Sequence, residues 1–101
     1  MRNLLDETIE VLTYFMKSLD DVVWIGDDKG EYTIEDFKKY ANKLYDNGYG
    51  CQEVEPSLLI VGDDWWLERA EYDGSEWWKF KLKPTRGHRP WHDENKIFGE
   101  F

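Results

Sequence analysis

The sequence predicts a single α+β domain in which two helices pack on an antiparallel sheet of three or four strands. Two segments carry apolar residues at helical spacing, several short runs are rich in β-branched and aromatic residues, and residues 65–82 form a hairpin pattern around Asp73-Gly74. The chain has 101 residues, of which 41% are hydrophobic, and it includes 6 Trp, 6 Tyr and 5 Phe. It can therefore bury a core without the help of a disulfide.

The first helix is expected over about residues 3–18, because its apolar positions lie three or four residues apart and form one stripe. Asp6, Glu7 and Glu10 lie in its first half, where negative charge favours the positive end of the helix dipole. Asp20-Asp21 ends the pattern. The predicted buried stripe consists of Leu5, Ile9, Leu12, Met16 and Leu19.

The middle of the chain predicts two short strands and the second helix. Residues 22–25 are rich in β-branched and aromatic side chains, and the turn formers of residues 26–30 follow them, with Glu31-Tyr32 as a brief returning strand. Thr33 is a suitable N-cap for a helix over about residues 34–47, which ends at a glycine. The apolar run at residues 58–61 then predicts a strand in the middle of the sheet.

The hairpin at residues 65–82 is the most specific local signal. A two-residue type I′ turn at Asp73-Gly74 would place Tyr72 opposite Ser75 and so determine the whole register, whereas a slip of one residue would exchange the two faces. On the face expected to join the core, the predicted pairs are Trp65 with Leu82, Leu67 with Phe80, and Arg69 with Trp78. On the other face they are Trp66 with Lys81, Glu68 with Lys79, and Ala70 with Trp77.

The net charge of −9 is unevenly distributed. Residues 1–76 hold 19 acids and 7 bases, a balance of −12, while residues 77–101 hold 3 acids and 6 bases, a balance of +3. We therefore predict one domain over residues 1–83 and a basic, extended C-terminal tail over residues 84–101. An acidic body repels nucleic acid and attracts basic surfaces, including the grooves in which other proteins hold nucleic acid. The alternative is that the acids serve solubility alone.

Cysteine usage and the N-terminus indicate a cytoplasmic protein. The single cysteine, Cys51, excludes an intramolecular disulfide and favours a reducing compartment. Acidic residues appear before any apolar core of signal-peptide length, and no run approaches the roughly 20 apolar residues that cross a bilayer. We expect no association with a membrane.

No grouping of residues predicts catalysis, a metal site or a cofactor. His88 and His92 are four residues apart, but Pro90 between them prevents the helix that would place both on one face. Cys51 is distant from both histidines in the chain, and a lone cysteine is usually a small buried apolar residue. The adjacent carboxylate pairs are typical of solvated turns, because neighbouring residues on a strand point to opposite faces. We therefore do not expect an enzyme.

Two kinds of ligand compete with a protein partner as explanations of the aromatic residues. Trp66, Trp77 and Trp91 could stack on bases beside the lysines and arginines of the C-terminal part, but the acidic body opposes direct binding of nucleic acid. A small ligand or nucleotide could bind around the loop Gly48-Tyr49-Gly50 and Trp24, because two glycines around an aromatic allow unusual backbone conformations.

The chain resembles a known protein family in and before the hairpin. The residues that carry the resemblance are 45–54 and 59–64, together with the motifs Trp65-Trp66-Leu67-Glu68-Arg69 and Glu71-Tyr72-Asp73-Gly74-Ser75-Glu76-Trp77-Trp78. Over about residues 21–82 the chain resembles a family of small uncharacterised acidic proteins encoded by phages and prophages of Gram-positive bacteria. The resemblance implies a soluble phage protein that acts in the host cytoplasm, and it brings no catalytic residues. Many phage proteins of this size and charge block host defences.

The sequence thus leads to the hypothesis of a phage-encoded, anti-CRISPR-like inhibitor. It would bind a host defence protein, a CRISPR effector or another nuclease, through an acidic surface that mimics nucleic acid, and would act as a monomer or small homo-oligomer. The alternatives are a phage accessory protein that binds a host regulator or virion component through exposed tryptophans, and the small-ligand module. The residues assigned to the partner are Asp27, Asp28, Asp63, Asp64, Trp66, Glu68, Glu71 and Trp77.

Overall fold

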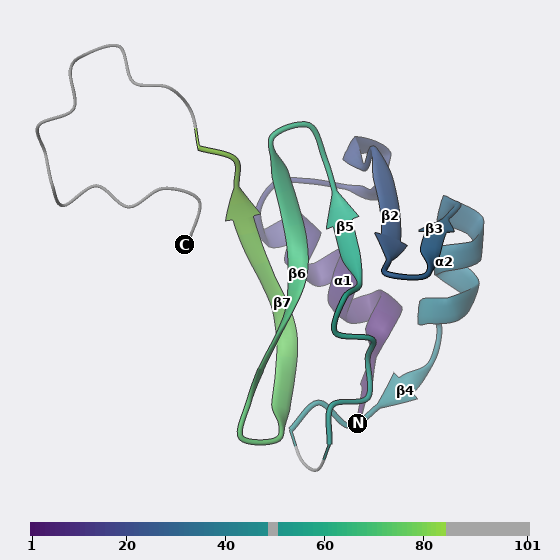
Figure 1. Ribbon diagram of the computed structural model, residues 1–101, viewed down its shortest axis with the longest axis vertical. Helices are drawn as coiled ribbons and strands as arrows, with labels where there is room; N and C mark the ends of the chain where they lie inside the picture. Colours follow the sequence, from purple (N-terminus) through teal and green to yellow (C-terminus); the bar gives the residue numbers. More distant parts are fainter. Residues whose placement is uncertain (49–50, 85–101) are drawn as a thin grey trace, which may run out of the picture.

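The computed structural model describes residues 1–48 and 51–84, and these residues adopt an α+β fold (Figure 1). In chain order the elements are β1 (Arg2–Asn3), α1 (Leu4–Tyr14), the 3₁₀ helix η1 (Leu19–Asp21), β2 (Trp24–Asp27), β3 (Gly30–Tyr32), α2 (Ile34–Ala41), β4 (Leu44–Tyr45), β5 (Leu59–Val61), β6 (Trp65–Tyr72) and β7 (Ser75–Leu82). Of the tail predicted over residues 84–101, all but Pro84 lies outside the described residues.

The main sheet has five strands in the order β3-β2-β5-β6-β7, and every neighbouring pair is antiparallel. It is therefore larger than the three or four strands that the sequence predicts. A separate two-stranded sheet joins β1 to β4. Strands of two or three residues are too short to show a period of two in sequence, so pairing with a partner is what defines them.

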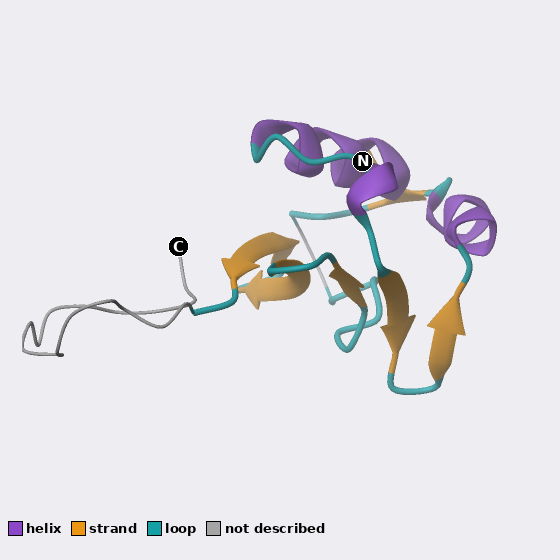
Figure 2. Cartoon of the chain, turned by 90° about the horizontal axis from the view of Figure 1, so that it is seen from above, coloured by secondary structure: helices purple, strands orange, loops and turns teal. Residues whose placement is uncertain are grey.

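Both helices lie on one face of the main sheet, and no described element covers the opposite face (Figure 2). A row of paired apolar side chains, Ile25, Ile60, Leu67 and Phe80, crosses four strands on the helix side. The buried apolar residues form one cluster between the layers: Leu4, Leu12, Ile25, Phe37, Ala41, Tyr45, Val54, Leu58, Ile60, Trp65, Leu67, Trp78 and Phe80.

The structure confirms the predicted hairpin register over all eight pairs, from Tyr72 with Ser75 to Trp65 with Leu82. The two turn residues, Asp73 and Gly74, have φ angles of 51° and 86°. A type I′ turn requires positive φ at both of these positions, which aspartate tolerates and glycine favours. The turn therefore determines which hairpin side chains enter the core.

Helix α1 differs from its prediction in length and in its buried face. It ends at Tyr14, four residues earlier than expected, and Met16 adopts a left-handed backbone with a φ of 62°. Ile9 is 44% exposed and Met16 is 91% exposed, although both belong to the predicted stripe. Leu12 is buried as predicted, but α1 also buries Leu4, Glu7 and Thr8, because the two polar side chains bond to groups inside the domain.

Helix α2 begins as predicted but is shorter. The hydroxyl of Thr33 accepts a hydrogen bond from the Asp36 amide at 3.0 Å, as an N-cap does. The helix ends at Ala41, so the prediction that it continues to residue 47 is wrong. Tertiary pairing competes with the helix here, because Leu44–Tyr45 forms β4 against β1. No helix among the described residues has the length and apolar character needed to cross a bilayer.

The buried face of α1 leads to a prediction about stability that differs from the one given by the sequence pattern. Leu12→Ala should lower the free energy of unfolding by about 2–5 kcal/mol, because it leaves a cavity in the core. Ile9→Ala should cost less than about 1 kcal/mol, because the Ile9 side chain is half exposed. Urea unfolding of both variants measures these values. Equal losses at the two positions would contradict the observed helix face.

Candidate functional site

The candidate site is the sheet face that points away from α1 and α2 (Figure 2). Pairing of β2 with β5 and of β5 with β6 brings Trp24, Val61 and Trp66 into one row. Ala70 and Trp77 pair on the same face of the hairpin. These positions alternate with the core residues of each strand. We call this surface the tryptophan face, and its apolar members are Trp24, Leu59, Val61, Trp66, Ala70 and Trp77.

The tryptophan face exposes aromatic area, and the polar groups around Trp66 are paired. Trp24 is 38% exposed and Trp77 is 40% exposed, and Trp66 is partly buried. The indole N–H of Trp66 donates to a Glu68 carboxylate oxygen at 2.7 Å. The other carboxylate oxygen of Glu68 lies 3.5 Å from the ammonium of Lys81. The Trp66 ring is thus held in place, with its only hydrogen-bond donor satisfied within the protein.

The centre of the face is close to neutral. Among the described residues, its charged side chains are two acids, Glu31 and Glu68, and two lysines, Lys79 and Lys81, all at positions that alternate with core residues. The acids that the sequence assigned to a partner surface lie mainly in the turns at the ends of the sheet. Asp63 and Asp64 follow β5, whereas Asp27 and Asp28 lie at the opposite end of the sheet, where β2 turns into β3.

The structure therefore brings together only some of the predicted site residues. Trp66, Glu68 and Trp77 share the tryptophan face. Glu71 pairs with Glu76 on the helix side of the hairpin, although its side chain is exposed. Because the two aspartate pairs lie at opposite ends of the sheet, the predicted acids do not form one continuous patch. Trp24 joins the face although the sequence did not assign it to a protein partner.

The acidic turn between β2 and β3 is well ordered by hydrogen bonds. The Lys29 amide donates to Asp27 at 2.8 Å and the Tyr32 hydroxyl donates to it at 2.9 Å, and together they hold the pKa of the Asp27 carboxyl below its usual value. Burial, with this hydrogen bond, raises the pKa of Tyr32 to about 12. The Asp28 amide donates to the Ser57 hydroxyl at 3.0 Å. A fixed negative charge is thus placed at this end of the face.

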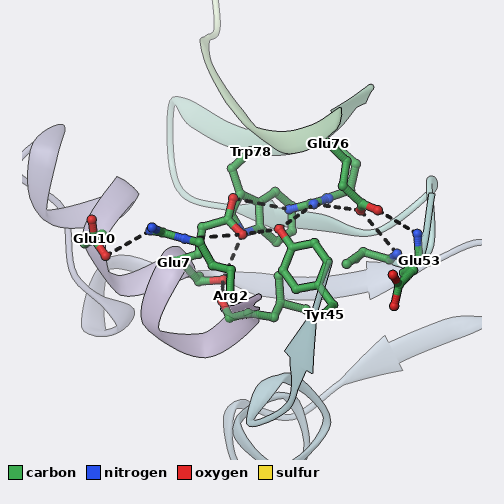
Figure 3. Close-up of polar contacts among 11 residues, drawn as sticks. Arg2, Glu7, Glu10, Tyr45, Glu53, Glu76 and Trp78 are labelled. Atoms are coloured by element: carbon green, nitrogen blue, oxygen red, sulfur yellow. Dashed lines mark hydrogen bonds and ion pairs between the residues drawn. The ribbon is translucent and has the colours of Figure 1, made fainter. Parts of the chain in front are cut away.

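A buried ionic cluster supports the hairpin from the helix side (Figure 3). The Arg69 side chain is fully buried, and its Nη2 donates to Glu76 at 2.8 Å and to the Tyr45 hydroxyl at 3.1 Å. Tyr45 in turn donates to Glu7 of α1. Arg69 Nη1 lies 4.0 Å from a Glu7 oxygen, and Nε and Nη1 have no hydrogen-bond partner among the described residues.

The cluster links four separate parts of the domain. Glu76 accepts hydrogen bonds from the backbone amides of Glu53 and Val54 at 2.6 and 3.2 Å. The guanidinium carbon of Arg69 lies 4.7 Å from the ring centroid of Trp78. The Trp78 indole donates to the Thr8 hydroxyl at 2.8 Å. These contacts join the hairpin to α1, β4 and the segment at residues 53–54.

We assign this cluster a structural role, because its charged groups are buried and bonded to one another. The sequence placed Arg69 on the core face but did not predict Glu7, Tyr45 or Glu76 as its partners. A signal was present: a buried arginine needs an anion, and Glu76 shares the face of Trp78 two residues away.

The structure gives less support to the small-ligand loop, the cysteine and the histidines that the sequence analysis considered. Of the small-ligand loop, Tyr49 and Gly50 lie outside the described residues, as do His88, His92 and Trp91. Cys51 is exposed, so the expectation of a buried thiol is wrong. A cavity of about 260 Å³ lies beside α1 and η1, and neither Gly48 nor Trp24 lines it. Within residues 1–48 and 51–84, no three His, Cys, Asp or Glu side chains gather as a metal ion would require.

Comparison of the chain with protein-family models, curated proteins and solved structures finds no match. Its function is therefore inferred from the geometry of the domain.

The buried cluster predicts a large effect of removing one anion. Glu76→Gln should lower the free energy of unfolding by about 3–5 kcal/mol, because it leaves Arg69 buried beside a neutral amide. Glu71→Gln is the matched control on the same strand pair and should change stability by less than about 0.5 kcal/mol, because Glu71 is exposed. Chemical denaturation of both variants tests this. A small loss for Glu76→Gln would mean that Arg69 does not depend on this carboxylate.

The cluster also predicts a loss of stability at high pH. Burial, together with the hydrogen bond to Glu7, raises the pKa of Tyr45 to about 12, above the value of about 10 in an unfolded chain. The folded state therefore holds this proton more tightly, and the resulting stability is complete below pH 10 and is lost as the pH rises toward 12.

Tyr45→Phe should remove this part of the pH dependence between pH 10 and 12. Urea unfolding across that range, with Tyr32→Phe in both backgrounds to remove the second shifted phenol, measures the difference. If the free energy of unfolding falls equally steeply with pH with and without the Tyr45 hydroxyl, the raised pKa of Tyr45 is contradicted.

Proposed function

We propose that this chain is a non-enzymatic binding protein that docks a partner protein on its tryptophan face. The observation that carries the proposal is a sheet face that no described element covers, on which Trp24 and Trp77 are exposed and Trp66 is partly buried. Contiguous apolar surface of this kind is typical of interaction sites. Tryptophan is also the residue type most enriched among interface positions that dominate binding energy.

The way in which the Trp66 ring is held favours tight binding. Trp66 is oriented by Glu68, and Lys81 pairs with the same carboxylate, so this part of the face is ordered before a partner arrives. A preorganised side chain loses little conformational entropy on binding. Leu59 and Val61 of β5 lie between Trp24 and the hairpin and continue the apolar surface across the sheet.

The distribution of charge defines the partner that we propose. The face is neutral at its centre and carries aspartate pairs in the turns at both ends, so a complementary surface has an apolar centre flanked by lysine or arginine. Basic grooves of nucleic-acid-binding enzymes supply the lysine and arginine side chains of such a surface. With a net charge of −9, we propose that the partner is a nuclease of a host defence system, such as a CRISPR effector, and that the chain inhibits it in the host cytoplasm.

A second candidate is a phage accessory protein that binds a host regulator or virion component. The neutral centre of the face favours it, because a contact made by the rings alone does not require a basic partner. The two candidates differ in whether binding depends on the aspartate pairs in the turns at the ends of the face. Substitution of these aspartates therefore distinguishes the candidates.

The test uses the full chain and a panel of purified host nucleases, with binding affinity and nucleic-acid cleavage measured at low and high salt. Trp66→Ala/Trp77→Ala should weaken binding to the inhibited nuclease by about 100-fold or more, because two anchors are removed. Asp63→Lys/Asp64→Lys should slow association by about 10-fold and reduce its salt dependence.

The matched control is Ile9→Ala/Leu44→Ala, which removes exposed apolar area away from the tryptophan face and should leave affinity unchanged. If the tryptophan variant binds and inhibits as well as the native chain, the face is not the docking surface. If binding persists unaltered after the aspartates are reversed, the accessory-protein candidate replaces the nuclease inhibitor.

A further inference from the structure

The cavity between α1 and η1 is a second place suited to binding, and it does not involve the tryptophan face. Its volume is about 260 Å³. Pockets for drug-sized ligands usually measure about 300–1,000 Å³, so a molecule that fills this cavity is smaller than a drug. All of its lining residues lie between Ile9 and Asp20, in one continuous stretch of the chain.

The cavity forms where the chain reverses at the end of α1. The Lys17 amide donates to the Leu12 carbonyl at 2.8 Å, and the Met16 amide donates to the Thr13 carbonyl at 3.0 Å. These two bonds make a Schellman motif, in which the residue with a left-handed backbone is usually glycine. Here that residue is Met16, with a φ of 62°. Backbone strain of this kind is concentrated at functional sites, and the reversal returns the following residues to the last turns of α1.

The apolar lining of the cavity is aliphatic. Leu12 is buried in the core, Leu19 is partly buried, and Ile9 is half exposed although it belongs to the apolar stripe of the helix. An aliphatic group placed in the cavity would cover exposed area of Ile9 and Leu19, which is favourable in proportion to the apolar area removed from water. The site therefore suits a small branched hydrocarbon group.

Two opposite charges line the same cavity without pairing with each other. The Lys17 ammonium lies 5.9 Å from the ring centroid of Trp65, at the outer limit of a cation–π contact. Neither this ammonium nor the Asp20 carboxylate forms an ion pair within residues 1–48 and 51–84. The Thr13 hydroxyl has no hydrogen-bond partner in the same part of the chain. A cation, an anion and a hydroxyl thus surround the aliphatic lining and are free to meet a ligand.

This combination of groups selects a zwitterion with an aliphatic side chain. Its carboxylate would accept hydrogen bonds from Lys17 and Thr13, and its ammonium would donate to Asp20. A ligand with only one of the two charges would leave either Lys17 or Asp20 without its counter-charge. A residue inside a peptide carries neither charge on its backbone, so a free amino acid meets these requirements better than a peptide segment does.

We propose that the cavity between α1 and η1 binds a free aliphatic amino acid of about the size of leucine. The hydrocarbon side chain would lie against Ile9, Leu12 and Leu19, with the two charged groups toward Lys17 and Asp20. The tryptophan face contributes no residue to this site. The proposal therefore does not depend on the partner protein, and its failure would leave the proposed function as it stands.

An NMR chemical-shift titration of the full chain with L-leucine tests the site. The amides of residues 9–20 should shift and reach saturation with a Kd of about 1 mM, because the cavity is small and partly open. The amides of Trp66 and Trp77 on the tryptophan face should not shift. Glycine has both charges but no side chain, and it should bind at least about 10-fold more weakly than leucine.

Two analogues of leucine, each lacking one charge, identify the partners of the charged groups. 4-Methylpentanoate lacks the ammonium and isopentylamine lacks the carboxylate, and each should bind about 3- to 5-fold more weakly than leucine. Lys17→Gln should abolish the advantage of leucine over isopentylamine, because the carboxylate has then lost its partner. Asp20→Asn should abolish the advantage of leucine over 4-methylpentanoate for the corresponding reason.

The matched controls are Lys39→Gln and Asp36→Asn in α2, which make the same charge changes away from the cavity and should keep the native affinity for leucine. Ile9→Ala removes part of the aliphatic lining from a half-exposed position, and it should weaken leucine binding by about 3-fold while the chain remains folded.

Three results would overturn the proposal. The first is the absence of a saturable shift in residues 9–20 on addition of leucine. The second is equal affinity for glycine and leucine, which means that the aliphatic lining contributes nothing. The third is that leucine keeps its advantage over each analogue in the matching variant, which means that Lys17 and Asp20 do not hold its charged groups.

Discussion

The buried ion pair between Arg69 and Glu76 organises the domain. Both side chains are removed from water, so each must find charged or polar partners inside the protein. Those partners come from distant parts of the chain. Arg69 donates to the Tyr45 hydroxyl, which in turn donates to Glu7, and Glu76 accepts from the amides of residues 53–54. The hairpin, the first helix and the loops between them are therefore held in one relative position by a single polar cluster.

This ion pair also explains why the two sides of the hairpin differ in their surroundings. On the helix side, Trp65 and Trp78 are buried, and Trp78 both faces Arg69 and donates to Thr8. Helix α1 turns its polar Glu7 and Thr8 inward to serve this cluster, and Ile9 consequently faces outward. On the other side, Trp66 and Trp77 have no described helix over them, and together with Trp24 they form an apolar surface that the domain itself does not need for its core.

The tryptophan face has an apolar, nearly neutral centre with aspartates in the turns at its ends. An acidic chain need not present its charge as one continuous patch. Here the acidic residues of the described part of the chain are spread over turns, helices and strands.

The hairpin, its register and the division of its tryptophans could be predicted from the sequence, because a two-residue turn and the alternation of side chains are local properties of Asp73-Gly74 and its flanks. The buried face of α1, the early end of α2 and the five-stranded extent of the sheet could not. Each depends on contacts between residues far apart, such as the 38 residues that separate Glu7 from Tyr45. The candidate site divides in the same way. The positions of Trp66 and Trp77 on one face could be predicted from the local hairpin turn. The position of Trp24 on that face and the separation of the aspartate pairs depend on the long-range pairing of β2 with β5.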